Sequence, residues 1–215
     1  MTQAIEQTRP IGLLIAAMGG EGGGVLRQWL VDAAMAHGLA VQSTSIPGVA
    51  QRTGATTYYI EMQPLETGGT AQPRPIMSLY PLAGSVDIMV ASELIEAARA
   101  MQNGFVTPNC TTLIASTHRA FSVAERTAMG DGRFDGSRAV KAAGTLAQQA
   151  VLFDMEAMAR EHDSVINSVL LGAIAGTNRL PIPAEGFETA IRDTGRAVEA
   201  NLAAFRAGYA AVERG

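Results

Sequence analysis

The residues best suited to bind a ligand are glycines around one glutamate, just after an apolar run from Ile11 to Ala17. A glycine turn that opens a helix exposes backbone N–H groups, and the helix dipole adds positive charge. Such a turn is therefore suited to a phosphate or pyrophosphate. A carboxylate at Glu21 disfavours an anion unless its side chain points elsewhere. Glycines also let a helix and a strand pack closely, so two interpretations stand, an anion site and a packing device. The candidate ligand-binding residues of this turn are Gly19, Gly20, Glu21, Gly22, Gly23 and Gly24.

The dinucleotide-binding fingerprint is incomplete at this turn. Gly20 and Gly22 match its first two glycines, but Val25 stands at the third position. The second expected strand ends in Thr44, without the acid that would bind a ribose, and the turn has no lysine for a P-loop. NAD is therefore disfavoured among the anionic ligands. A stand-alone Rossmann-type nucleotide-binding or NAD-dependent enzyme is kept as an alternative function.

Ligands for a metal are scarce in this sequence. Cys110 is the single cysteine, so the chain cannot form an intramolecular disulfide, an iron–sulfur cluster or a structural zinc site. The three histidines lie far apart, without the spacing of metal ligands. We expect no metal site and assign no catalytic acid or base to this chain.

Composition and charge exclude several classes of protein. The 215 residues carry a net charge of −4 and no cluster of basic residues, which argues against nucleic-acid binding. No apolar stretch approaches the roughly 20 residues that span a bilayer. The tail from Met1 to Pro10 lacks the apolar core of a signal peptide. We expect a cytoplasmic protein with no membrane partner and one domain over residues 1–215.

The spacing of apolar residues indicates an α/β fold with a doubly wound, mostly parallel, Rossmann-like sheet. Ile11 to Ala17, a helix from Val25 and Leu39 to Thr44 predict a right-handed βαβ unit with parallel strands. Residues 138–215 are expected to be mainly helical, because Ala-rich helical spacing replaces the strand pattern there. Further strands are predicted at Thr56 to Met62, Val86 to Val90 and Thr111 to Ala115, and late helices at Arg138–Glu161, Ser164–Ala175, Ala184–Ile191 and Arg196–Tyr209.

Several segments, in the same order, resemble the gamma-type subunit of 2-oxoacid:acceptor oxidoreductases. The glycine turn resembles the glycine signature of that family, and Ile46 to Ala55 resembles its Gly-x-x-Gln-Arg-x-Gly segment. Val86 to Val90 followed by Glu93 is similar to its strand-then-acid pattern. Asn167 to Ala173 and Glu199 to Gly208 resemble its later helices. Within the family, Arg52 to Tyr59 looks most like the beta subunits of indolepyruvate ferredoxin oxidoreductases.

The resemblance implies a role inside a larger enzyme. Members of the family oxidatively decarboxylate a 2-oxoacid on thiamine diphosphate with Mg²⁺, pass the electrons through [4Fe-4S] clusters to ferredoxin and transfer the acyl group to coenzyme A. One cysteine and no thiamine signature assign the clusters and thiamine diphosphate to a separate large subunit. The expected assembly is a hetero-oligomer, a dimer of heterodimers, in which this chain is inactive alone and completes the active site.

The resemblance also extends the list of candidate cofactor-binding residues. The turn at Gln51, Arg52 and Thr53 and the helical Asn167 join the glycine turn, with coenzyme A as the associated ligand. The planar fork of Arg52 suits a phosphate or the carboxylate of the oxoacid. An ion pair at a subunit interface is the other interpretation of Arg52, and a non-catalytic assembly subunit is the corresponding third function.

Overall fold

The computed structural model describes residues 9–46, 55–65, 76–118 and 136–214. Its described strands form one sheet in the order β2-β3-β1-β4-β5-β6. β1, β4, β5 and β6 are parallel neighbours, whereas β3 pairs antiparallel with both β1 and β2. The predicted mostly parallel α/β fold is therefore confirmed. The strands are β1 (Ile11–Met18), β2 (Leu39–Ile46), β3 (Ala55–Pro64), β4 (Ile88–Ala91), β5 (Thr112–Ser116) and β6 (Gln149–Phe153).

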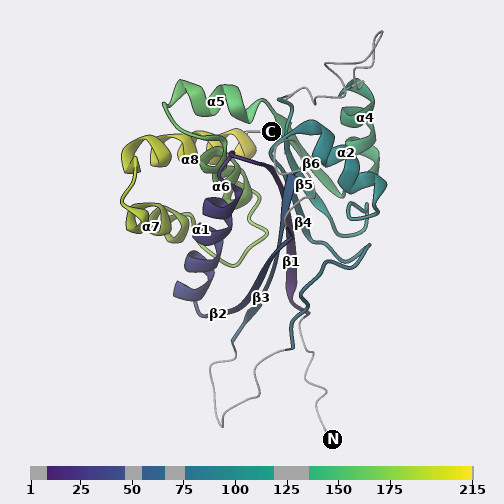
Figure 1. Cartoon of the computed structure of the whole chain (residues 1–215), viewed down its shortest axis with the longest axis horizontal. Coiled ribbons are helices and arrows are strands. Elements are labelled where there is room, and N and C mark those ends of the chain that lie inside the picture. The colour runs from purple at the N-terminus through teal and green to yellow at the C-terminus, as the bar shows by residue number, and fades with distance from the viewer. Residues whose placement is uncertain (1–8, 47–54, 66–75, 119–135, 215) are drawn as a thin grey trace, which may run out of the picture.

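Helices cover the sheet on both faces, with α2 and α4 on one side and the remaining described helices on the other (Figure 1). Buried side chains alternate between the faces, as strand geometry requires. Leu13 and Ile15 pack toward α1 and α6, and Leu14 and Ala16 pack toward α2. The helices are α1 (Gly23–Ala36), α2 (Leu94–Gln102), α4 (Gly136–Leu146), α5 (Met155–Glu161), α6 (Ile166–Gly176), α7 (Ala184–Thr194) and α8 (Val198–Glu213).

Two features of the sheet differ from the sequence expectation. β1 and β2 run in the same direction, as predicted, but the antiparallel β3 lies between them. The predicted helix Arg138–Glu161 is wrong, because β6 divides it into α4 and α5. β6 pairs with β5 and forms the edge of the sheet, where its first residues are exposed. Pairing with β5 thus overrides the helical propensity of this Ala-rich segment.

The C-terminal part is otherwise mainly helical, as predicted, and its centre is α6, whose residues are all buried. α6 crosses α8 at very short range. A Cβ added to Gly172 would lie 2.0 Å from the carbonyl oxygen of Phe205, and one added to Gly208 would lie 2.4 Å from that of Val169. This close approach fixes α6, which carries Asn167 in its first turn.

No helix in the described ranges is long and apolar enough to span a membrane.

Candidate functional site

The carboxyl ends of β1 and β4 are the candidate site. These strands are parallel neighbours, yet α1 follows β1 on one face of the sheet and α2 follows β4 on the other. The chain therefore diverges at this point. In open α/β sheets, ligands bind in the crevice where such a divergence occurs.

The glycine turn lies at these strand ends, and its backbone conformation and close packing both require glycine. Gly20 and Gly22 have φ angles of 95° and 75°, a backbone conformation that residues with a side chain rarely adopt. Gly22 is the N-terminal cap of α1, and its carbonyl accepts from the amides of Val25 and Leu26. Gly23 meets the packing requirement, because its added Cβ would lie 2.5 Å from the Cβ of Ala17.

The N-terminus of α1 has no side-chain cap. The helix also has no acid in its first turn. Since the first N–H groups of a helix have no intrahelical partner, the amides of Gly23 and Gly24 point out of the N-terminus. The dipole of a 14-residue helix adds positive charge at the same place. This end of α1 can bind an anionic oxygen.

Glu21 is held by a neighbouring strand end. The hydroxyl of Ser92, which follows β4 and is buried, donates a short hydrogen bond to the carboxylate of Glu21. The same hydroxyl accepts a hydrogen bond from the amide of Met18 at 3.1 Å. Glu21 thus links the end of β1 to the end of β4, and its carboxylate is hydrogen-bonded within the protein.

Two more carboxylates lie at the start of α2. Glu93 is fully buried and caps the helix by accepting from the amide of Ile95 at 2.9 Å. Glu96 forms an ion pair with Arg99. Burial raises the pKa of Glu96 above the usual glutamate value, while Arg99 acts in the opposite direction. In the described ranges, no group of acids, histidines and cysteine could hold a metal ion.

Asn167 reaches the glycine turn from the other end of the sequence. Its side chain is 2% exposed, and its Nδ2 donates to the carbonyl of Gly22 at 3.4 Å. A Cβ added to Gly22 would lie 2.9 Å from this nitrogen. The structure therefore brings two of the predicted site elements, the turn and Asn167, into contact. The N-terminus of α6 meets that of α1 here.

The predicted Gln51, Arg52 and Thr53 lie outside the described residues. The strand ends on either side of them, Ile46 and Ala55, are at the sheet edge that carries the glycine turn, since Ala55 pairs with Met18. The sequence patterns alone did not indicate Ser92, Glu96 or Arg99. The signal for Ser92 was present, as a small polar residue directly after an apolar strand.

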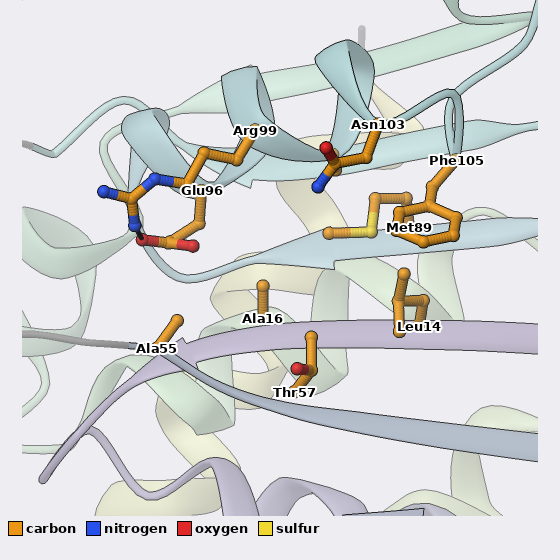
Figure 2. Close-up of a pocket in the computed structure, with 10 residues that line it drawn as sticks. Leu14, Ala16, Ala55, Thr57, Met89, Glu96, Arg99, Asn103 and Phe105 are labelled. Carbon is orange, nitrogen blue, oxygen red and sulfur yellow. Dashed lines mark hydrogen bonds and ion pairs between the residues drawn. The ribbon is translucent and has the colours of Figure 1, made fainter. Parts of the chain in front are cut away.

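A cavity of about 330 Å³ lies between α2 and the sheet. Figure 2 shows Glu96 and Arg99 at one end and Leu14, Met89 and Phe105 at the other. Its floor comes from alternate residues of β1 and from Thr57 of β3. The cavity thus combines an apolar lining with one charged pair.

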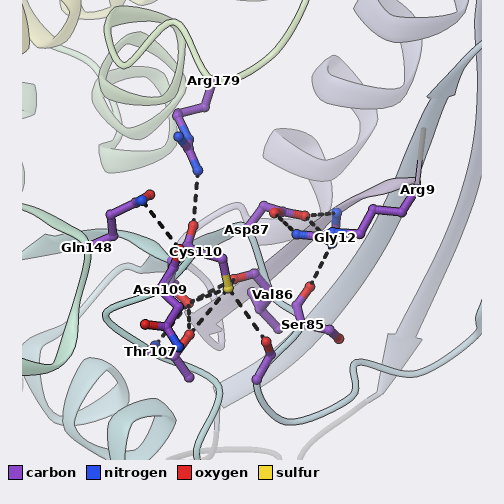
Figure 3. A network of polar contacts seen from close by, with 12 residues as sticks. Arg9, Gly12, Ser85, Val86, Asp87, Thr107, Asn109, Cys110, Gln148 and Arg179 are labelled. Atoms are coloured by element: carbon purple, nitrogen blue, oxygen red, sulfur yellow. Dashed lines mark hydrogen bonds and ion pairs between the residues drawn. The ribbon is translucent and has the colours of Figure 1, made fainter. Parts of the chain in front are cut away.

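The amino edge of the sheet carries a separate polar network (Figure 3). Asp87 accepts from the amide of Gly12 at 2.8 Å and pairs with Arg9. The thiol of Cys110 is 3.3 Å from the hydroxyl of Thr107 and contacts backbone carbonyls. Cys110 is partly exposed. These contacts tie strand ends together, far from the glycine turn.

A family model, pyruvate ferredoxin/flavodoxin oxidoreductase, matches residues 12–211. The chain belongs to this family. The match includes the glycine turn, Asn167 and every strand of the sheet except the first residue of β1. No curated protein matches the sequence significantly.

Solved structures share the fold at low sequence identity. Pyruvate oxidoreductase subunit PORC from Thermotoga maritima is 18% identical, with a TM-score of 0.65 over 94% of this chain and 97% of that one. The gamma subunit of a keto/oxoacid ferredoxin oxidoreductase from Geobacter sulfurreducens is 16% identical, with a TM-score of 0.63 over 95% and 99%.

A larger protein contains the same fold as one part. The 2-oxoglutarate:ferredoxin oxidoreductase from Magnetococcus marinus, solved with 2-oxoglutarate, coenzyme A and succinyl-CoA bound, is 17% identical with a TM-score of 0.65. The match covers 96% of this chain and 32% of that one. In that oxidoreductase, other parts of the polypeptide accompany the shared fold.

Proposed function

We propose that this chain is the small, gamma-type subunit of a 2-oxoacid:acceptor oxidoreductase and forms one domain over residues 1–215. The observation that carries the proposal is the family match over residues 12–211. The relatives that share the fold over nearly their whole length are described as a pyruvate oxidoreductase subunit and an oxoacid oxidoreductase gamma subunit. The chain contributes to catalysis within a complex.

The proposed reaction divides its chemistry between two subunits. A 2-oxoacid loses carbon dioxide on thiamine diphosphate, its electrons pass through iron–sulfur clusters to ferredoxin, and the acyl group forms a thioester with coenzyme A. One cysteine does not fit the ligand set of a cluster, so these groups belong to a large partner subunit. An aryl pyruvate such as indolepyruvate is the proposed substrate, on the resemblance of Arg52 to Tyr59.

This chain's part is to complete the active site with the carboxyl edge of its sheet. The amides of Gly23 and Gly24 would hold a phosphate of coenzyme A. Support for this ligand comes from the uncapped end of α1, the buried amide of Asn167 beside it and the coenzyme A bound to the Magnetococcus marinus relative. Arg52 would bind a phosphate or the carboxylate of the oxoacid.

Reconstitution tests the proposal directly. The full chain is expected to be colourless and inactive alone, and to give coenzyme A-dependent oxidation of an aryl pyruvate when combined with a subunit that carries thiamine diphosphate and clusters. Rates with pyruvate and 2-oxoglutarate in the same assay decide the oxoacid. Iron in the purified chain, or oxoacid oxidation by this chain alone, would refute the assignment of the clusters and thiamine diphosphate to a partner subunit. Stabilisation by NAD but not by coenzyme A in thermal unfolding would favour the stand-alone enzyme.

Replacement of Arg52 separates a site role from an assembly role. Arg52→Ala is expected to lower kcat/KM of the reconstituted complex by about tenfold or more, as loss of a charge-assisted hydrogen bond does. The amount of complex on size-exclusion chromatography should not change. Arg160→Ala, at an exposed position on α5, is the matched control. Reduced complex formation with normal turnover per complex would identify a non-catalytic assembly subunit.

A further inference from the structure

The cavity between α2 and the sheet has a divided lining that no step of the proposed reaction uses. Its volume of about 330 Å³ lies at the lower end of the range of roughly 300 to 1,000 Å³ that small-molecule sites occupy. Figure 2 shows the ion pair of Glu96 and Arg99 at one end, and the apolar side chains of Leu14, Met89 and Phe105 at the other. The cavity therefore suits a small molecule that is charged at one end and apolar at the other.

Glu96 is the inner member of this ion pair. Its side chain is 9% exposed, whereas that of Arg99 is 53% exposed. Arg99 donates to Oε1 of the carboxylate, and no described residue donates to the other oxygen, which points away from Arg99 in Figure 2. A buried ion pair is stable when further hydrogen bonds satisfy its remaining lone pairs, so this second oxygen calls for an N–H donor.

The electrostatic surroundings of Glu96 favour a cation as that donor. Burial raises the pKa of Glu96, and the negative charges of Glu93 and Glu21 act in the same direction, while Arg99 acts against them. A cationic group of a ligand would offset the cost that burial and these two carboxylates impose on the charged form of Glu96. The buried end of the ion pair is thus a subsite for an ammonium group.

Arg99 provides a subsite for an anion next to the ammonium subsite. Its guanidinium has five N–H donors, and the contact with Glu96 uses Nη1. Because the side chain is half exposed, the other donors are accessible to a carboxylate. At the far end of the cavity, Met89 and Phe105 suit an aromatic ring, since both a thioether and a second ring make favourable contacts with one.

We propose that this cavity binds a free α-amino acid with an aromatic side chain. The ammonium group pairs with Glu96, the carboxylate pairs with Arg99, and the ring lies on the apolar lining. An α-amino acid carries both charged groups on one carbon, which matches the side-by-side arrangement of the two residues. A carboxylic acid without the amine would add a negative charge beside Glu96 and supply no cation. The site lies on the α2 face of the sheet, and its existence does not depend on the proposed function.

Three probes with related carbon skeletons test the two charged contacts. L-phenylalanine has both groups, 3-phenylpropionate lacks the amine, and phenethylamine lacks the carboxylate. In isothermal titration calorimetry of the full chain, L-phenylalanine is expected to have a Kd about tenfold or more below that of either analogue, as loss of a charge-assisted hydrogen bond predicts. Equal affinity for 3-phenylpropionate would overturn the contact with Glu96. No binding of L-phenylalanine at millimolar concentration would overturn the site.

Substitutions of the ion pair assign each contact. Glu96→Gln should weaken L-phenylalanine and phenethylamine by about tenfold or more and leave 3-phenylpropionate unchanged or tighter, because only an ammonium group loses its counter-ion. Arg99→Gln should weaken L-phenylalanine and 3-phenylpropionate and leave phenethylamine unchanged. Equal losses for all three probes would assign the pair a structural role and refute the proposal. Glu156→Gln, which removes an exposed ion pair on α5, is the matched control and should change no affinity.

NMR of the methionine methyl groups locates the ligand. Met89 lines the cavity, so the ring of bound L-phenylalanine should shift its methyl signal, which is assigned by its loss in Met89→Leu. The methyl signal of the exposed Met35, at the end of α1, should not move. Saturable binding that leaves the Met89 signal unchanged would place the ligand elsewhere and overturn the proposal. Oxoacid oxidation by the reconstituted complex is a separate measurement, so failure of the proposed function would leave these results in force.

Discussion

Single residues at the carboxyl edge of the sheet differ in how well their polar groups are satisfied. Glu21 accepts a hydrogen bond from the hydroxyl of Ser92, and Glu93 accepts one from the amide of Ile95 in the first turn of α2. Glu96 forms an ion pair with Arg99, but burial raises the pKa of Glu96 by more than the ion pair lowers it. Among the described residues, Asn167 Oδ1 has no hydrogen-bond partner. These differences separate the carboxylates that hold the edge together from the one buried amide oxygen whose hydrogen bond is unmade.

The raised pKa of Glu96 predicts a pH-dependent stability. The folded state binds the Glu96 proton more tightly than the unfolded state does. Protonation of Glu96 therefore adds to the free energy of unfolding below the usual glutamate pKa range, and this stabilisation is lost as the pH rises through the raised pKa. Glu96→Gln should therefore raise Tm at neutral pH by a few degrees at most, because 1 kcal/mol corresponds to about 2 to 4 °C in a chain of this size.

Calorimetry at a series of pH values, from below the usual glutamate pKa up to neutral pH, measures this effect. The Tm difference between variant and wild type should shrink toward the acidic end. Glu156→Gln, which removes an exposed ion pair on α5, should change little at any pH. A variant less stable than wild type at neutral pH would contradict the burial argument.

Among the elements, the crossing of α6 and α8 is the one on which the site depends most. Glycines at Gly172, Gly176 and Gly208 let the two backbones approach, and the approach holds the first turn of α6 against Gly22. Any side chain at these positions has to push against backbone atoms. The helices would then separate, and Asn167 would move with α6.

Gly172→Ala is expected to destabilise the chain by about 2 to 3 kcal/mol, in the range of overpacked cores. The physical reason is the 2.0 Å distance between its added Cβ and the Phe205 carbonyl oxygen. Urea unfolding measures the change. Gly144→Ala is the control, because Gly144 lies in α4 and a Cβ added there has no neighbour within contact distance. This substitution should raise the free energy of unfolding by about 0.5 to 1 kcal/mol. Equal effects at both positions would refute the close-packing argument.

At the scale of the whole molecule, the described part of the chain carries large exposed apolar side chains beside β2 and β3. Residues 76–82 attach to these strands through Thr44 and Glu61. Ile76 is 98% exposed, and Tyr80 and Leu82 are 65% and 72% exposed. Monomeric proteins rarely expose such groups together, and they are typical of surfaces that another protein covers.

The isolated chain is accordingly expected to self-associate at micromolar concentration. The double substitution Ile76→Ser and Leu82→Ser should reduce the weight-average sedimentation coefficient toward that of a monomer. Met35→Ser, which removes a similarly exposed side chain at the end of α1, is the control and should have little effect. A concentration-independent monomer before any substitution would contradict this prediction.

The sequence by itself determined the α/β class, the first strand and helix, the glycine turn and the expected absence of cluster ligands. These features depend on local periodicity, on backbone conformations that favour glycine, and on composition. Only the tertiary structure decided that β3 lies antiparallel between β1 and β2, and that Gln149–Phe153 is a strand. It also placed Asn167 beside Gly22 and Ser92 beside Glu21. Strand order and contacts between distant residues follow from the packing of whole elements, which no local pattern encodes.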